Sequence, residues 1–196
     1  MIAFQEDIVL DNERVRLSPL SMEHLDDLLP IALDHPDLIK YSPPAWGSKK
    51  HLKSYVENVL KLRRQEAKYS FVIYDKAAEK FVGHTSYMSI SAYHKRLEIG
   101  STWLRPETQG TGLNKHMKYL MLSYAFDVLM AQRVELKTDS RNLQSRRAIE
   151  KIGAEYEGKL RSHTLMQDGY RRDTVFYSIL VHEWSTIKET IFKEFS

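Results

Sequence analysis

The chain has 196 residues, of which 42% are hydrophobic, so it can bury one core, and we expect a single domain over residues 1–196. Its 29 basic and 26 acidic residues give a net charge of only +3 and are scattered, which argues against a nucleic-acid-binding surface. There is no cysteine, which excludes thiol nucleophiles, disulfides and cysteine-based metal sites.

The N-terminus carries acidic residues early and lacks the basic and apolar regions of a secretory signal. No apolar run reaches the ~20 residues that a membrane span needs. We therefore expect a cytoplasmic protein without a membrane partner.

The first third of the chain predicts two helices. Residues 15–35 begin extended, Ser18-Pro19 supplies a helix-start signal, and apolar residues then recur at helical spacing. The segment from Tyr41 to Gly47, YSPPAWG, has two prolines and a glycine and predicts a loop. Residues 48–65 predict a second amphipathic helix.

The remaining elements alternate between strand and helix patterns. Residues 69–75 and 80–90 predict a hairpin around a turn from Lys76 to Glu79. The later predicted strands are 96–104, 133–139, 154–166 and 171–180, and the later predicted helices begin near Gly112, at 142–153 and at 182–195. This order predicts an α/β fold with a mixed sheet and helices on both faces.

The stretch RPETQGTGLNKH, residues 105–116, joins a predicted strand to a predicted helix through Gly110 and Gly112. Unpaired N–H groups at a helix start, together with glycines that let the backbone wrap closely, form a natural phosphate cradle. The glycines could equally make only a tight connection. The stretch matches neither the P-loop pattern nor the dinucleotide pattern, which needs a glycine where Lys115 stands.

What fits is Gln109-x-x-Gly112-x-Asn114, which resembles the Q/R-x-x-G-x-G/A signature of the GNAT superfamily, the Gcn5-related N-acetyltransferases. Asn114 departs from the usual glycine or alanine. The later segments LKTDSRNLQSRRAIEKIGAEYEGKLR and GKLRSHTLMQDGYRRDTVFYSIL are most similar to the ribosomal-protein N-terminal acetyltransferase branch.

The resemblance implies the GNAT fold, a mostly antiparallel central sheet, and acetyl-CoA as the acetyl donor. It also implies cofactor contacts from the loop N–H groups, from the strand end before the loop and from the following helix start. These residues are Trp103, Leu104, Gln109, Gly110, Thr111, Gly112, Leu113, Asn114, Asn142 and Ser145.

Glu98 is the first catalytic candidate, because it stands in a strand expected to be buried on both faces, eleven residues before Gln109. Some members of the resembling family carry a catalytic glutamate on this strand. Burial would raise the pKa of its carboxyl toward the range useful for a general base, acting directly or through water. The alternative is a structural glutamate paired with a nearby arginine.

Asn142 and Ser145 lie one helical turn apart at a predicted helix start. The resemblance implies that Asn142 contacts the pantetheine arm and that Ser145 lies near the sulfur, where it could donate to the departing thiolate. The alternative is that Asn142 only caps the helix.

His84 is a weaker candidate base, since a lone histidine in a strand is more often structural. The eight histidines form no metal-binding spacing, so no metal site is expected.

In the resembling family the acceptor amine enters between the first interhelical loop and the last hairpin. Tyr41 and Trp46 could form an apolar wall there, or fold back over the core. Asp168 and the strand glutamate could attract a cationic amine.

Two functions follow from these observations. The first is an acetyl-CoA-dependent N-acetyltransferase whose acceptor is a small-molecule amine or a protein N-terminus. The second is a catalytically idle acyl-CoA-binding module with the same fold. The last hairpin and the terminal helix could pair subunits in a homodimer.

Overall fold

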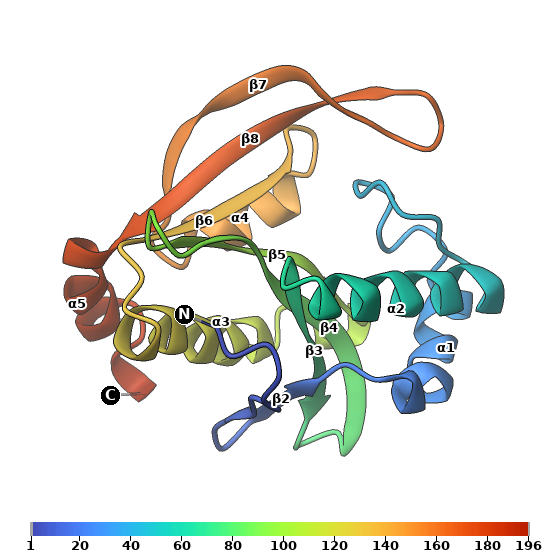
Figure 1. Ribbon diagram of the computed structural model, residues 1–196, viewed down its shortest axis with the longest axis horizontal. Helices are drawn as coiled ribbons and strands as arrows, with labels where there is room; N and C mark the ends of the chain where they lie inside the picture. The colour runs from blue at the N-terminus through green and yellow to red at the C-terminus, as the bar shows by residue number, and fades with distance from the viewer. Residues whose placement is uncertain (1, 196) are drawn as a thin grey trace.

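The computed structural model describes residues 2–195, which build one eight-stranded sheet in the order β1-β2-β3-β4-β5-β6-β8-β7 (Figure 1). Every neighbouring pair is antiparallel except β5 and β6, which confirms the mixed, mostly antiparallel sheet. The strands are β1 Leu10–Asp11, β2 Val15–Pro19, β3 Lys68–Asp75, β4 Lys80–Ser91, β5 Arg96–Leu104, β6 Arg133–Asp139, β7 Glu155–Leu165 and β8 Arg171–Leu180.

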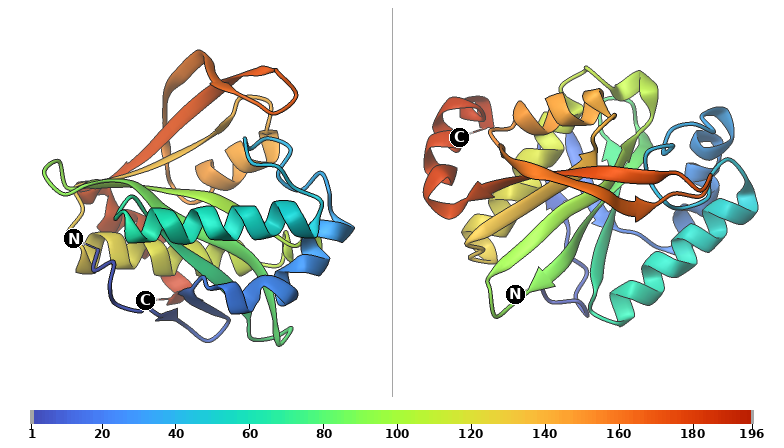
Figure 2. Two further views of the ribbon diagram at one scale, coloured as in Figure 1. Left: turned by 45° about the vertical axis from the view of Figure 1, so that its right-hand side comes forward. Right: turned by 90° about the horizontal axis from the view of Figure 1, so that it is seen from above.

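Helices cover both faces of the sheet, as the order of elements predicts (Figure 2). Helices α1 and α2 pack on one face, and α3, α4 and α5 contribute to the core on the other. The helices are α1 Leu25–Asp34, α2 Lys49–Arg64, α3 Leu113–Ser123, α4 Leu143–Glu150 and α5 Val181–Thr190. A π-helical turn, Tyr124–Val128, follows α3, and short 3-10 turns lie at Met22–His24, Pro106–Thr108 and Lys193–Phe195.

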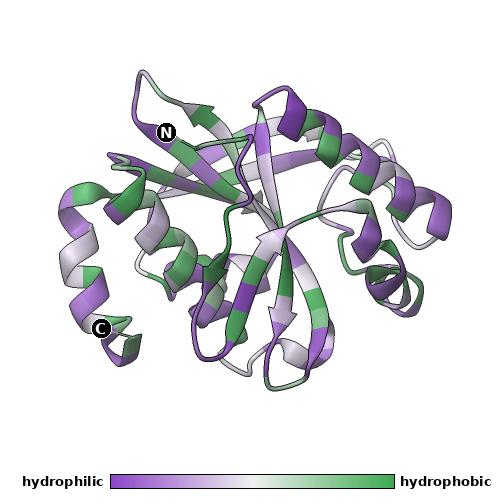
Figure 3. Cartoon of the chain, turned by 60° about the horizontal axis from the view of Figure 1, so that its bottom comes forward, coloured by the Kyte–Doolittle hydropathy of each residue, from purple (hydrophilic) through white to green (hydrophobic). Residues whose placement is uncertain are grey.

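The two faces bury separate apolar clusters because each helix is hydrophobic on one side only (Figure 3). The smaller cluster joins α1 and α2 to Val72 of β3 and Trp103 of β5. The larger cluster joins α3, α4 and α5 to the opposite side of the sheet. The functional elements are thereby fixed to a rigid centre.

The first helix begins later than the sequence predicts. Pro19 is still paired with Phe71 in the sheet, so Ser18-Pro19 ends a strand and does not start a helix. Ser21 caps the 3-10 turn instead, and its N–H donates to His24 Nδ1 at 3.1 Å. Proline is accepted at a strand end because its missing N–H costs little there.

The parallel strands β5 and β6 separate after a short paired stretch. They are paired only from Arg96 to Glu98 on β5 and from Arg133 to Glu135 on β6. β5 continues to Leu104 and β6 continues to Asp139, so their carboxyl-terminal halves diverge. This opening in the sheet carries the candidate site.

Candidate functional site

The loop before α3 is shaped by two glycines in the left-handed backbone region. Gly110 has φ +78° and Gly112 has φ +88°, and a Cβ built on either would meet no atom within 4 Å. Packing therefore does not require glycine at these positions, but the backbone conformation favours it. The surface above both residues is open to a ligand.

The first N–H groups of α3 have no acceptor within residues 2–195. This applies to Gly112, Leu113 and Asn114, whereas the Lys115 N–H already donates to Gly112 O at 2.8 Å. Free N–H groups and the positive end of the helix dipole attract anions. The residues present thus fit a phosphate or pyrophosphate group.

Gln109 connects this loop to two other elements. Its Nε2 donates to Leu104 O at 3.1 Å, and its Oε1 accepts from Gln144 Nε2 at 2.6 Å. Thr111 Oγ1 donates to Thr108 O at 2.7 Å, which stiffens the turn. The loop is therefore tied both to the end of β5 and to α4.

A cleft of about 430 Å³ lies beside this loop. Its walls come from the loop after α1, the turn after β5 and the start of α4, with residues Asp34, His35, Pro36, Asp37, Leu38, Lys40, Tyr41, Pro106, Gln109, Asn142 and Gln144. The structure thus brings the predicted residues Tyr41, Gln109 and Asn142 around one opening.

Asn142 caps α4, as the alternative interpretation of this residue predicts. Its side-chain oxygen accepts from the Ser145 N–H at 3.1 Å. The hydroxyl of Ser145 is not needed for this cap, and Asn142 keeps its amide NH₂ as a further donor. Capping and ligand binding by Asn142 are therefore compatible.

Trp103 and Leu104 end β5 with buried side chains, 6% and 7% exposed. Their side chains belong to the core, so any contact of these two residues with a ligand would have to come from the backbone. The Leu104 carbonyl is held by Gln109.

Glu98 is buried on β5, with 3% of its surface exposed. Its Oε2 lies 2.8 Å from Lys137 Nζ and accepts from Ser89 Oγ at 3.1 Å. A Cβ on Gly100 would come within 2.8 Å of Glu98 Oε1, so that glycine makes room for the carboxylate. The partner is a lysine of β6, not the arginine that the structural alternative assumes.

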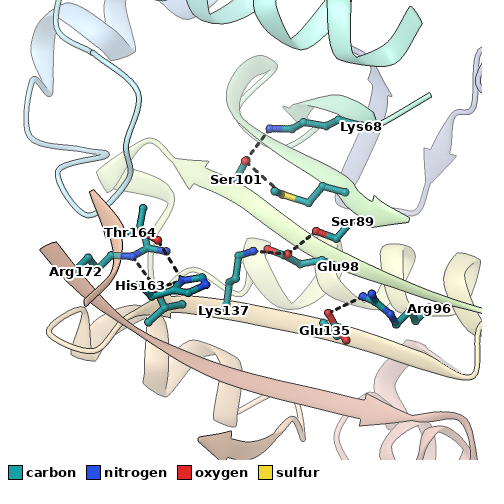
Figure 4. A network of polar contacts seen from close by, with 12 residues as sticks. Lys68, Ser89, Arg96, Glu98, Ser101, Glu135, Lys137, His163, Thr164 and Arg172 are labelled. Carbon is teal, nitrogen blue, oxygen red and sulfur yellow. Dashed lines mark hydrogen bonds and ion pairs between the residues drawn. The ribbon is translucent and has the colours of Figure 1, made fainter. Parts of the chain in front are cut away.

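Two lysines near Glu98 were missed by the sequence analysis (Figure 4). Lys137 comes from β6. Lys68 comes from β3 and is 8% exposed, and its Nζ donates to Ser101 Oγ at 2.8 Å. Desolvation lowers the pKa of Lys68 to about 8, against the opposing pull of Glu98. No local signal identifies either lysine, because strand register alone places them there.

The two aromatic residues of the loop after α1 have different surroundings. The ring of Trp46 lies 5.0 Å from that of Trp103, and its Nε1 donates to His35 O at 3.1 Å, so Trp46 folds back over the core. The ring of Tyr41 lies 5.8 Å from the Arg141 guanidinium, which itself stacks on Tyr170 of the last hairpin at 3.7 Å. Arg141 thus connects Tyr41 to the last hairpin.

His84 has the structural environment expected of a lone strand histidine. It is fully buried, and its Nδ1 lies 2.9 Å from Ser101 O and 3.1 Å from the Tyr55 hydroxyl. Desolvation lowers its pKa to about 3, and the nearby Lys68 charge acts in the same direction.

Within the described residues, no group of three His, Cys, Asp or Glu side chains is placed to hold a metal ion. None of the helices in residues 2–195 has the length and apolar character needed to cross a membrane.

Comparison with known proteins identifies the family signature. The family model for the "Acetyltransferase (GNAT) domain" matches residues 14–155. The Bacillus subtilis protein "Putative ribosomal N-acetyltransferase YdaF" is 33% identical over 102 residues, which are 52% of this chain and 55% of the relative. The match thus spans about half the length of that curated relative.

Solved structures share the whole architecture. The crystal structure of a "putative acetyltransferase" from T. thermophilus is 33% identical, covers 100% of both chains and has a TM-score of 0.87. Mycobacterium smegmatis RimJ, solved with CoA-disulfide, is 21% identical, with 86% of this chain and 83% of RimJ covered and a TM-score of 0.75. This second likeness concerns the fold alone.

Proposed function

This chain belongs to the GNAT acetyltransferase family, and from that premise we propose that it transfers an acetyl group from acetyl-CoA to a primary amine. The observation that carries the proposal is the loop before α3. Its free N–H groups and the two glycines with open space above them lie where β5 and β6 diverge.

In the proposed complex the N–H groups of Gly112, Leu113 and Asn114 bind the pyrophosphate of CoA. The backbone of Trp103 and Leu104 orients the pantetheine arm, and the Asn142 amide donates to it. When bound, acetyl-CoA supplies an activated thioester carbonyl. No covalent bond to the protein is needed, which suits a chain without cysteine.

The acceptor nitrogen attacks the carbonyl carbon, and the C–S bond breaks as the new C–N bond forms. We assign the proton of the amine to Glu98, directly or through water. Both described contacts of its carboxylate go to Oε2, which leaves Oε1 available as an acceptor. Ser145 would donate its hydroxyl hydrogen bond to the departing thiolate.

The names of the relatives favour one class of acceptor. YdaF is named for ribosomal N-acetylation. We propose that the acceptor enters between the loop after α1, which lines the cleft, and the β7–β8 hairpin, whose Arg172 donates to Tyr41 O of that loop. We therefore propose a protein N-terminus as one acceptor, with a small-molecule amine as the other.

One observation favours the idle alternative. Lys137 lies 2.8 Å from Oε2 of Glu98, so a charged protein partner already occupies one oxygen of the proposed base. A module that binds acyl-CoA without turnover would keep the same cofactor loop.

Calorimetric titration with acetyl-CoA, CoA and ATP tests cofactor binding. We expect micromolar binding of both CoA species, no binding of ATP, and loss of CoA binding in Gly112→Glu, which places a negative charge in the cradle. Gly169→Glu is the matched control. Gly169 also has a positive φ, +81°, and a Cβ built on it would meet no atom within 4 Å, but it lies in the β7–β8 turn, away from the loop before α3. Absence of CoA binding by folded wild-type protein would refute the proposal.

Turnover then separates the enzyme from the idle module. We expect release of free CoA with at least one amine from a panel of peptides, amino acids, polyamines and amino sugars. CoA binding with no release across the panel would favour the idle module.

A further inference from the structure

Glu98 contacts one cation, Lys137, and two further cations, Lys68 and Arg172, lie farther from its carboxylate (Figure 4). Lys137 Nζ lies 2.8 Å from its Oε2. Desolvation lowers the pKa of both Lys68 and Arg172, and the negative charge of Glu98 opposes this lowering at both residues. Lys68 is 8% exposed and Arg172 is 7% exposed, so little water screens their charges. The single negative charge of Glu98 cannot neutralise the positive charges of these three side chains.

A second acidic residue, Asp139, does not restore the charge balance of the site. Asp139 is fully buried and near enough to act on Arg172, but it already makes a two-pronged ion pair with Arg141, at 3.1 and 2.8 Å. The site therefore holds four cations, Lys68, Lys137, Arg141 and Arg172, against two anions, Glu98 and Asp139.

In the part of the chain that the structure describes, Arg172 has only neutral hydrogen-bond partners. Its Nε donates to Thr174 Oγ1 at 3.1 Å, and its Nη1 donates to Tyr41 O at 2.8 Å. Within residues 2–195, Nη2 has no acceptor and no carboxylate lies within ion-pair distance of the guanidinium. A buried cation without an ionic partner costs free energy, and a bound anion would recover it.

The position of Arg172 is on the acceptor side of the site. It stands on β8 and reaches the loop after α1, the two elements between which we propose that the acceptor enters. Thr174, its neighbour on the same face, is paired with Asp139 of β6. An acceptor that enters between these two elements would therefore pass Arg172.

The expected attraction of a cationic acceptor does not fit this charge distribution. Asp168 is exposed in the β7–β8 turn, where its Oδ1 accepts from the Tyr170 N–H at 3.0 Å, and Glu98 is outnumbered by cations. A polyamine would meet net positive charge in this site.

We propose that the acceptor carries a carboxylate in addition to its amine, and that Arg172 binds this carboxylate through its free Nη2, with Lys68 adding to the positive potential. The planar fork of arginine matches a carboxylate in geometry and charge. The proposal rests on the proposed acetyl transfer and defines its substrate class as anionic amines. The carboxylate can belong to a free amino acid or to an acidic side chain behind a peptide N-terminus.

Matched acceptor pairs test this proposal. Alanine and alanine amide present the carboxylate of a free amino acid, and the amides of Ala-Asp-Gly and Ala-Asn-Gly present that of a peptide side chain. We expect kcat/KM, corrected for the fraction of neutral amine, to favour the anionic member at least tenfold in one of the pairs. Equal rates in both pairs, or preference for a diamine such as putrescine, would overturn the proposal.

Three variants test which side chains cause the preference for the anionic acceptor. Arg172→Met should abolish it, and Lys68→Gln, which leaves the Arg172 contacts intact, should reduce it several-fold. Lys53→Gln, an exposed lysine of α2, is the control and should retain it. A preference unchanged in both Arg172→Met and Lys68→Gln contradicts the assignment.

A binding experiment distinguishes failure of this inference from failure of the proposed function. If no acceptor is acetylated, the protein is titrated calorimetrically with N-acetylalanine and its amide. Preferential binding of the carboxylate, lost in Arg172→Met, supports the anion site without any transfer. Equal or absent binding of both compounds refutes it.

Discussion

The ammonium of Lys137 lies 2.8 Å from Oε2 of Glu98 and joins β6 to β5. Glu98 is the last residue of β5 that pairs with β6, and Lys137 stands two positions after its pairing partner, Glu135. The ion pair therefore stands where the two strands begin to diverge. It holds the carboxylate in one orientation, and in the described part of the chain both contacts of the carboxylate go to Oε2 and none to Oε1. This geometry makes Glu98 the first residue to test.

We expect Glu98→Gln to lower kcat by roughly 10²- to 10⁴-fold, the usual contribution of a general base. Glutamine keeps the volume of the side chain and can still accept from Ser89, so affinity for acetyl-CoA should be unchanged. Steady-state kinetics and calorimetry measure the two effects. Glu57→Gln, on the exposed side of α2, is the control, and Glu98→Gln activity within threefold of wild type would exclude the base role.

Substitution of Asn142 separates its cap from its proposed ligand contact. Serine is as good a helix cap as asparagine, so Asn142→Ser should keep the free energy of unfolding within ~0.5 kcal/mol. The lost amide donor should weaken acetyl-CoA binding by about tenfold. Asn142→Ala should show the weaker binding and also lose ~1 kcal/mol of stability in urea unfolding. Unchanged affinity in Asn142→Ser would leave only the capping role.

Ser145→Ala tests the donor to the thiolate. The cap uses the backbone N–H of Ser145, and alanine favours helices, so stability should not fall. We expect kcat to fall by roughly 10- to 100-fold, since a hydrogen bond to a charged group contributes ~1.5–3 kcal/mol. Ser185→Ala on exposed α5 should have full activity. A fall in melting temperature with kcat retained would point to a structural serine.

Lys118 of α3 makes stability depend on pH. It is 6% exposed, and among residues 2–195 its Nζ has one hydrogen-bond partner, Thr102 Oγ1, at 3.4 Å. Burial lowers its pKa from the ordinary 10.5 to about 7. Above pH 10.5 the amine is neutral in both states, and as pH falls toward 7 the unfolded chain gains a proton that the folded chain does not. This destabilises the fold over that window and levels off below pH 7.

Lys118→Met should therefore stabilise the protein, by an amount on the order of a few kcal/mol near pH 6 and by less at about pH 9. Urea unfolding at the two pH values measures the difference. Lys61→Met, an exposed lysine of α2, should show no such pH dependence. The same stabilisation by Lys118→Met at both pH values would argue against a shifted pKa.

Most of the element order could be predicted because it depends on local periodicity and turn chemistry. The turn at Lys76–Glu79, the helix after Gly112 and the end of α4 near Gly153 lie where the sequence indicates. The two-residue strand β1 was missed because so short an extended segment has no periodicity. The start of α1 was misplaced because Ser18-Pro19 fits a strand end as well as a helix start.

The sequence by itself determined the fold class and the backbone conformation of the loop before α3, because a glycine-containing strand-to-helix connection encodes its own conformation over a few residues. Only the tertiary structure decided the charge around Glu98. Lys68, Lys137 and Arg172 come from β3, β6 and β8, and strand order and register bring Lys137 into contact with Glu98 and place the other two where its charge acts on them. Such long-range pairings leave no mark in the local sequence, so neither the lysine partner of Glu98 nor the excess of buried cations could be predicted from it.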